Sequence, residues 1–132
     1  MAKINFNNKS KVIIVYVEIK IKDRMARLKM ALDTGATYIM IPWDVAETLG
    51  LEPGLSKEKT EMITASGVEK TPIVTLEAVS VAGNEIRNIK ALVHDLPPKS
   101  YVDGLLGLSF LKNFNIYFNF EQGFLELTRQ KL

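Results

Sequence analysis

The sequence predicts an all-β domain, folded as a closed or partly open barrel with two short helices. Apolar and polar residues alternate in several short runs, most clearly from Phe114 to Phe120. Turn-forming residues separate these runs, as at Lys22-Asp23-Arg24 and Glu121-Gln122-Gly123. The length of 132 residues fits a single domain that can bury a real core.

The first part of the chain is expected to form a loose arm followed by a hairpin. Residues 1–10 are mostly polar and predict the arm. Val12 to Ile21 predicts a strand, because every second residue from Ile13 onward is Ile or Val. After the turn at 22–24, alternation over residues 27–32 predicts the strand that leads to Asp33.

Downstream of Asp33 we expect a further apolar run and a short helix. Tyr38 to Ile41 is apolar, and Pro42 to Leu49 predicts the helix, with Pro in its first turn and Gly50 at its end. Leu51 to Lys59 contains Pro and Gly and predicts a loop.

The remaining elements follow from the same signals of alternation and turn residues. They are a hairpin over Thr60–Leu76, strands over Ile73–Val81 and Ile86–Val93, an extended loop over Leu96–Ser100, a helix over Ser109–Lys112, strands over Phe114–Phe120 and Phe124–Thr128, and a tail over 129–132.

The segment Ala31–Thr37 places a carboxylate, Asp33, on a tight turn between two apolar segments. An ionised carboxylate there is costly unless hydrogen-bond donors face it. Gly35 allows backbone N–H groups to approach the carboxylate, and the Thr34 hydroxyl can both donate and accept. The alternative is an ordinary polar turn, since Asp and Gly are common turn residues.

Three motifs together resemble the retropepsin-like aspartic proteases. Leu32–Thr37 resembles their catalytic loop, and Leu105-Leu106-Gly107 resembles the second signature that packs beneath it. Thr64–Val68 falls where that family has its flap, a mobile hairpin over the substrate. The spacing and the segment Gly104–Leu111 are most similar to the bacterial and archaeal single-domain members. The similarity extends from about Val12 to Leu127.

The resemblance implies a retropepsin-like acid protease barrel with one half-site per chain. The protease domain would cover residues 11–128, between the arm 1–10 and the tail 129–132. Asp33 would be the catalytic acid and base, Thr34 would bond across a two-fold axis, and Gly35 would offer its N–H near the carboxylates. The other implied roles are substrate binding by the flap residues Thr64, Ala65, Ser66 and Gly67, and support of the loop by Ala36, Leu105, Leu106 and Gly107.

Peptide hydrolysis by carboxylates requires two of them, one to take a proton from water and one to hydrogen-bond the scissile carbonyl oxygen. The chain has a single Asp-Thr-Gly; Asp103 precedes Gly104 but lacks the Thr/Ser-Gly that would orient it. The second acid would then be Asp33 of another copy. We therefore predict a homodimeric aspartic endopeptidase that acts on extended polypeptides and uses no metal or cofactor.

Two alternatives stay open at this point. One is a catalytically silent retropepsin-like module for dimerisation or peptide binding, because a fold does not guarantee activity. The other is an unrelated β-barrel binding protein with a chance motif.

Composition argues against several other classes. The 17 basic and 15 acidic residues give a net charge of +2, so neither a nucleic-acid nor a membrane partner is expected. We interpret the basic run as a solvated hairpin face; it comprises Lys20, Lys22, Arg24, Arg27 and Lys29.

The chain has no cysteine, which excludes disulfides and thiolate chemistry, and its lone histidine, His94, is poor evidence for a metal site. The start of the chain is polar and the run Val12–Val17 is too short to span a membrane. We expect a soluble, cytoplasmic protein.

Overall fold

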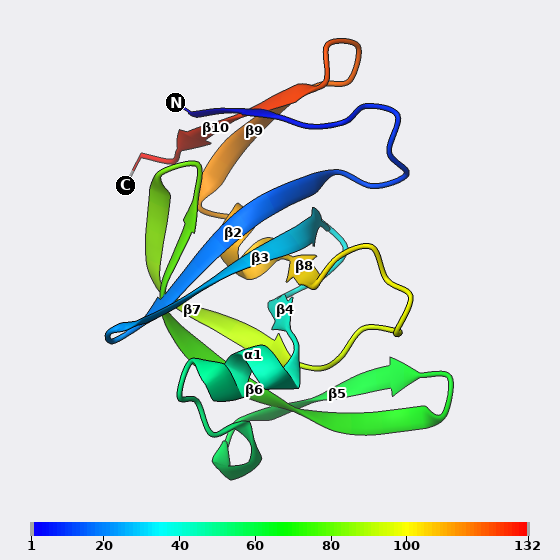
Figure 1. Cartoon of the computed structure of the whole chain (residues 1–132), viewed down its shortest axis with the longest axis vertical. Helices are drawn as coiled ribbons and strands as arrows, with labels where there is room; N and C mark the ends of the chain where they lie inside the picture. Colours follow the sequence, from blue (N-terminus) through cyan, green and yellow to red (C-terminus); the bar gives the residue numbers. More distant parts are fainter. Residues whose placement is uncertain (1, 132) are drawn as a thin grey trace.

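The structure, a computed structural model, describes residues 2–131, so Met1 of the predicted arm and Leu132 of the predicted tail lie outside the described residues. Figure 1 shows the arrangement of the elements. The strands are β1 (Ala2–Asn5), β2 (Ile14–Ile21), β3 (Arg24–Leu32), β4 (Ile39–Ile41), β5 (Lys59–Thr64), β6 (Gly67–Val81), β7 (Asn84–Val93), β8 (Gly104–Leu106), β9 (Phe114–Asn119) and β10 (Phe124–Arg129). The helices are α1 (Trp43–Thr48), the 3₁₀ turn η1 (Pro53–Leu55) and α2 (Leu108–Leu111).

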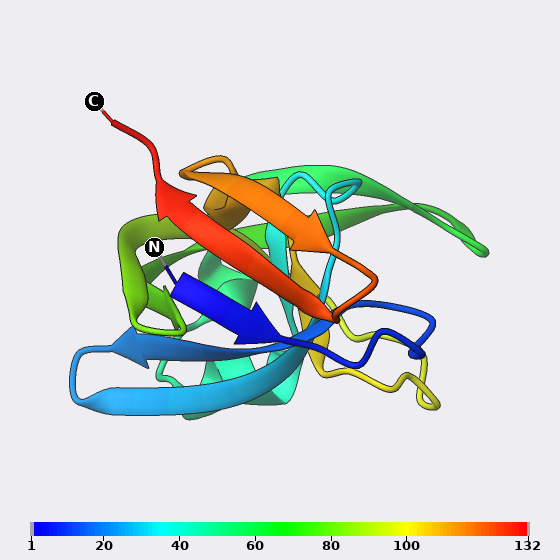
Figure 2. The same cartoon turned by 90° about the horizontal axis from the view of Figure 1, so that it is seen from above.

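Six strands close into a barrel in the order β2-β3-β8-β4-β7-β6, because β6 also pairs with β2. Strand β5 pairs only with β6 and forms a hairpin with it that projects from the barrel (Figures 1 and 2). The interior is filled by alternate residues of the strands, for example Val17, Ile19 and Met30, which are fully buried. The predicted all-β barrel with short helices is confirmed.

Strand β8 is short but decides how the site is built. It lies between β3, to which it is parallel, and β4, to which it is antiparallel. Leu106 pairs with Leu32 and is buried, so β8 runs alongside the end of the strand that leads to Asp33. Two segments about 70 residues apart in the sequence are therefore joined at one end of the barrel.

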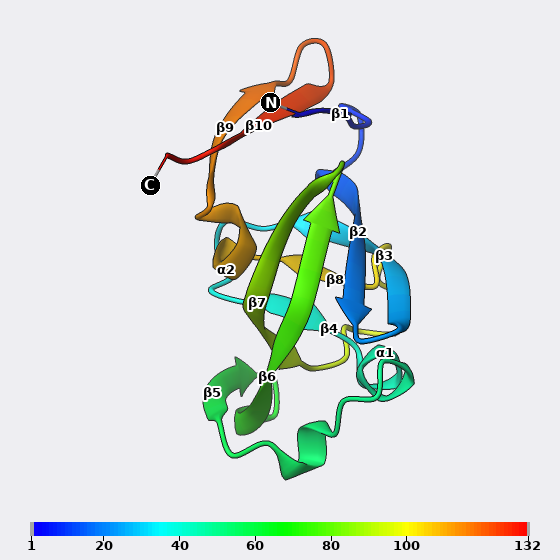
Figure 3. The ribbon, with the colours of Figure 1, turned by 90° about the vertical axis from the view of Figure 1, so that its left-hand side faces the viewer.

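A separate sheet in the order β1-β10-β9 packs across the barrel (Figure 3). Residues 2–5 of the predicted loose arm form β1 in this sheet, so that prediction is wrong for these residues. Ala2 pairs with Leu127 and Ile4 with Leu125, and Ile4 packs against the core. The order comes from this long-range pairing; the alternation of Ala2, Ile4 and Phe6 with polar residues is a local strand signal that the sequence analysis did not use.

Strand β6 is a single strand of 15 residues, whereas the sequence predicted a flap strand and a barrel strand that overlap. Its first four residues, 67–70, are exposed in the projecting hairpin, and its next four, 71–74, are buried. One strand thus serves both the hairpin and the barrel. Across residues 2–131, each helix falls short of the length and apolar character needed to cross a membrane.

Candidate functional site

The candidate site is the turn that follows β3. The Gly35 N–H donates to Asp33 Oδ1 at 2.8 Å, and the Ala36 N–H donates to the Asp33 carbonyl oxygen at 3.2 Å. The Asp33 N–H donates to the Leu106 carbonyl oxygen at 3.0 Å, which fixes the start of the turn to β8. Asp33 is half-buried, and its carboxylate is held by the backbone N–H that the sequence predicted.

The turn is supported from behind by the segment that joins β8 to α2. The Leu108 N–H donates to the Ala36 carbonyl oxygen at 2.8 Å, and the Ser109 N–H donates to the Thr37 carbonyl oxygen at 2.9 Å. Gly107 is buried between them and leaves no room for a side chain, since an added Cβ would lie 2.7 Å from the Ala36 oxygen. The structure therefore brings Ala36 together with the Leu105-Leu106-Gly107 segment.

Ser109 is a supporting residue that the sequence analysis missed. Its Oγ accepts a hydrogen bond from the Ile39 N–H at 3.0 Å, so α2 is tied to the start of β4 as well as to the turn. The sequence around Ser109 does not show this role, because only the fold brings the residue to β4. Its place two residues after the Leu105-Leu106-Gly107 motif was the single sequence signal that could have pointed to a supporting role.

We expect Ser109→Ala to destabilise the protein by about 1–2 kcal/mol, because the Ile39 N–H loses its acceptor in a partly buried place. Urea unfolding measures this change. Ser100→Ala is the matched control, since Ser100 is exposed and its hydroxyl makes no hydrogen bond within residues 2–131. Equal stability of the two variants would contradict the assigned role.

Asp103 has a structural position, away from Asp33. Its N–H donates to the Lys29 carbonyl oxygen at 2.7 Å, and its Oδ2 accepts from the Lys29 N–H at 2.9 Å. It therefore binds the backbone of β3 four residues before Asp33. Among residues 2–131, the Asp33 carboxylate has the Gly35 N–H as its hydrogen-bond partner, and the Asp103 carboxylate is bonded to β3 instead.

The two residues after Asp33 face outward. Thr34 and Gly35 are both exposed, and the Thr34 hydroxyl makes no hydrogen bond with any residue in the range 2–131. A threonine at a turn with a free hydroxyl beside a held carboxylate is available to contact another molecule.

The predicted flap residues lie at the tip of the β5–β6 hairpin. Thr64 Oγ1 donates to the Gly67 carbonyl oxygen at 3.1 Å and accepts from the Ser66 N–H at 3.2 Å, so the turn is closed locally. Near the tip, Ile63 and Val68 are paired and expose 86% and 63% of their surface. In the described residues the tip makes no hydrogen bond to the Asp33 turn.

The base of this hairpin is fixed, in contrast to its tip. Ser56 Oγ donates to the Ile73 carbonyl oxygen at 2.6 Å, and Lys90 Nζ lies 2.7 Å from Glu58 Oε2. The hydrogen bond that Lys90 Nζ donates to the Glu58 carboxylate raises the pKa of Lys90 above its ordinary value. Movement of the hairpin would therefore be confined to its outer part.

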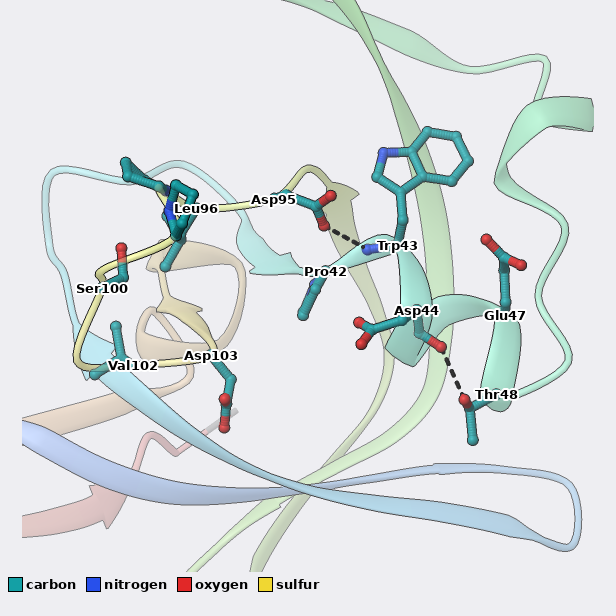
Figure 4. A pocket seen from close by; sticks show the side chains of 12 residues that line it. Pro42, Trp43, Asp44, Glu47, Thr48, Asp95, Leu96, Ser100, Val102 and Asp103 are labelled. Atoms are coloured by element: carbon teal, nitrogen blue, oxygen red, sulfur yellow. Dashed lines mark hydrogen bonds between the residues drawn. The ribbon is translucent and has the colours of Figure 1, made fainter.

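A cavity of about 910 Å³ lies between α1 and the loop 95–103 (Figure 4). Two of the carboxylates that line it serve local hydrogen bonds: Asp95 accepts from the Trp43 N–H at 3.0 Å and Asp44 from the Val45 N–H at 2.8 Å. Asp33 does not line this cavity. Among residues 2–131, no group of three or more His, Asp or Glu side chains is arranged to hold a metal ion.

Comparison with known proteins gives the family. The model of a family described as "gag-polyprotein putative aspartyl protease" matches residues 17–113, which include the Asp33 turn and the whole of β8. The chain belongs to this aspartyl protease family. The predicted resemblance to retropepsin-like proteases is thereby confirmed, and Asp33-Thr34-Gly35 lies inside the matched region.

Two individual proteins are similar to this chain, a member of the aspartyl protease family. An uncharacterized protein in the cobV 5′ region of a Sinorhizobium species is 33% identical over 90 residues, or 67% of this chain. The aligned part spans 37% of that relative's length. The crystal structure of a retropepsin-like aspartic protease from Rickettsia conorii matches with a TM-score of 0.71 and 26% identity, over 95% of this chain and 87% of that one. The retropepsin-like fold is therefore shown.

Proposed function

We propose that the protein is an aspartic endopeptidase that works as a homodimer, with a water molecule activated between the two Asp33 carboxylates. The observation that carries the proposal is the Asp33 turn itself. One carboxylate is held by the Gly35 N–H at an exposed turn, while Asp103 is bonded to the backbone of β3. One chain thus supplies half of the required pair of acids.

The chemistry needs the two carboxyl groups in different protonation states. The ionised one takes a proton from water as the water oxygen attacks the carbonyl carbon, and the protonated one hydrogen-bonds the carbonyl oxygen. The resulting tetrahedral intermediate breaks its C–N bond as a proton passes to the leaving nitrogen. The enzyme forms no covalent bond to the substrate in this scheme.

Thr34 and Gly35 have supporting roles in the proposed dimer. The exposed Thr34 hydroxyl would donate to the facing turn of the second copy and accept from it, which holds the two carboxylates close together. The Gly35 N–H donates to Asp33 Oδ1 and so fixes the orientation of the carboxylate that would take the proton from water.

An extended polypeptide with apolar side chains near the cut is the proposed substrate class. A cavity of about 440 Å³ is lined mainly by apolar groups, among them Ala31 and Leu105. These two residues pair with each other, and Ala31 lies two residues before Asp33 in the sequence. The exposed Ile63 and Val68 of the hairpin supply more apolar surface, as expected of a flap that closes over a peptide.

Cleavage of an unfolded protein by the wild type and two variants tests the proposal. We expect Asp33→Asn to lose peptide-bond hydrolysis by at least about 1,000-fold, because the amide cannot accept the proton from water. Asp103→Asn is the matched control: its amide oxygen can still accept from the Lys29 N–H, so activity should be retained. Product masses identify the cleaved bonds, and pepstatin-like transition-state mimics should block the reaction.

Cleavage that survives Asp33→Asn would overturn the proposal. A stable dimer that binds peptides and does not cleave them would instead favour a catalytically silent module. A cytoplasmic location stays a prediction from the sequence.

A further inference from the structure

We propose that a cavity lined by lysines, close to the Asp33 turn, binds an acidic side chain of the substrate. The protease would then prefer peptides that carry glutamate or aspartate about four residues from the cleaved bond. This proposal rests on the proposed function. It narrows the substrate class from any extended apolar polypeptide to one with a carboxylate at a defined place along the chain.

The cavity has a volume of about 450 Å³ and lies where the segment before β2, strand β3 and the loop 95–103 meet. Three lysines line it, Lys9, Lys11 and Lys29, and every charged residue in its lining is basic. Within residues 2–131, all ion pairs involve other basic residues, so no carboxylate neutralises these three ammonium groups. We call this space the lysine cavity.

Lys29 lines the lysine cavity from a fixed position in β3. Its N–H donates to Asp103 Oδ2 at 2.9 Å, and its carbonyl oxygen accepts from the Asp103 N–H at 2.7 Å. Leu28 and Met30 on either side of it are buried, so Lys29 lies on the opposite, outer face of the strand, where it is half-buried. A half-buried ammonium group without a carboxylate partner is costly, and an anionic side chain of a bound peptide would supply that partner.

The lysine cavity adjoins the apolar cavity of about 440 Å³ that is proposed above to take apolar side chains. Both cavities are lined by Val12 and Tyr101. Along the outer face of β3, Ala31 lines the apolar cavity, and Lys29, two residues earlier, lines the lysine cavity. A peptide with an apolar side chain in the first cavity can therefore continue into the second.

The walls of the two cavities lie on the side of the barrel from which the proposed flap projects. Figures 1 and 2, from perpendicular directions, show the segment before β2 (blue) and the loop 95–103 (yellow) on the same side as the β5–β6 hairpin (green). A peptide held under the hairpin would have these walls beside it.

The spacing along β3 gives the position of the acidic residue. Lys29 precedes Asp33 by four residues, which is about 13 Å in a strand. An extended peptide covers the same distance in about four residues. Each copy of the proposed homodimer would carry one lysine cavity, so the preference should appear on both sides of the cleaved bond.

The polar groups around the lysine cavity favour a carboxylate over a basic or neutral side chain. Besides the lysines, the Tyr101 side chain is 73% exposed, and its hydroxyl can donate a hydrogen bond to an anion. Lys99 lines the adjoining apolar cavity and adds a further positive charge. By contrast, the cavity of about 910 Å³ between α1 and the same loop is lined by acidic residues, among them Asp44 and Asp95, and would repel a carboxylate.

Pairs of synthetic peptides test the preference directly. Product masses from the digest of an unfolded protein locate a cleaved bond; the peptides keep the residues around it and carry Glu or Gln at the fourth position on either side. At about pH 6, where a glutamate in a peptide is ionised, we expect wild-type kcat/KM to be about tenfold higher for the Glu peptide. In about 1 M salt, where the Debye length is about 3 Å, this ratio should fall to about twofold.

Charge reversal in the lysine cavity gives a second test. Lys29→Glu should invert the preference, so that a peptide with Lys at the fourth position is cleaved faster than the one with Glu, whereas Lys29→Arg should keep the wild-type preference. Lys20→Glu is the matched control, since it makes the same change of charge at an exposed position of the same hairpin that lines neither cavity. Lys9→Gln combined with Lys11→Gln lies outside the strands and should lower the ratio about threefold, even if Lys29→Glu does not fold.

Equal kcat/KM for Glu and Gln peptides, with Glu at the third, fourth or fifth position, would overturn the proposal. A preference that Lys20→Glu weakens as much as Lys29→Glu does would overturn it as well. Asp33-dependent cleavage would in either case still support the proposed function. Should the peptides show no preference while Lys29→Glu abolishes binding of a fluorescent single-stranded oligonucleotide, the cavity serves nucleic acid instead. Absence of cleavage of every peptide would count against the proposed function and the preference together.

Discussion

Gly107→Ala is expected to destabilise the protein by about 3 kcal/mol and to lower its Tm by roughly 10 °C. The added Cβ would lie 2.7 Å from the Ala36 oxygen and 2.8 Å from the Tyr38 carbonyl carbon. Both contacts are with backbone, and the Ala36 oxygen also accepts a hydrogen bond from the Leu108 N–H, so the turn must move to relieve them. Gly107 has φ −96° and ψ −170°, an extended conformation open to any residue. The glycine is therefore required for space.

Thermal and urea unfolding measure the loss, and Gly54→Ala is the matched control. No atom lies within 4 Å of a Cβ added at Gly54, so that variant should stay within about 0.5 kcal/mol of the wild type. Gly107→Ala should also lose activity below its Tm, because relief of the contact displaces the turn that holds Asp33. A Gly107→Ala protein as stable as Gly54→Ala would mean that the turn accommodates a side chain.

Gly107 also shows what the sequence can predict. The Asp33 turn and the segment 105–107 are short motifs that can be recognised in the sequence. Their contact with each other was predictable from the family resemblance. The barrel was predictable because barrel strands such as β2 alternate, with Val15, Val17 and Ile19 buried on one face. The hydrogen bond from Gly35 to Asp33 followed from the turn alone.

Pairing between distant segments could not be predicted in the same way. Strand β1 is ordered by β10, more than 110 residues away, and the short alternation of its own sequence does not indicate which strand it pairs with. The roles of Ser109 and Asp103 depend on which backbone groups the fold leaves beside them. The continuity of β6 was missed because its exposed and buried halves have different patterns.

The proposed dimer belongs to this second class, and mixing of subunits tests whether activity requires it. When wild-type and Asp33→Asn chains are mixed in equal amounts and allowed to exchange, about one quarter of the dimers should carry two Asp33 carboxylates. If both acids are needed, the wild-type chains should keep about half of the activity they have alone. A tenfold excess of Asp33→Asn should leave about one tenth.

A site complete within one chain would respond differently, because added inactive chains could not alter it. Asp103→Asn chains, which should keep the Asp33 turn, serve as the control for mixing itself and should cause no loss. Full activity of the wild-type chains in the presence of a tenfold excess of Asp33→Asn chains would contradict the need for two carboxylates.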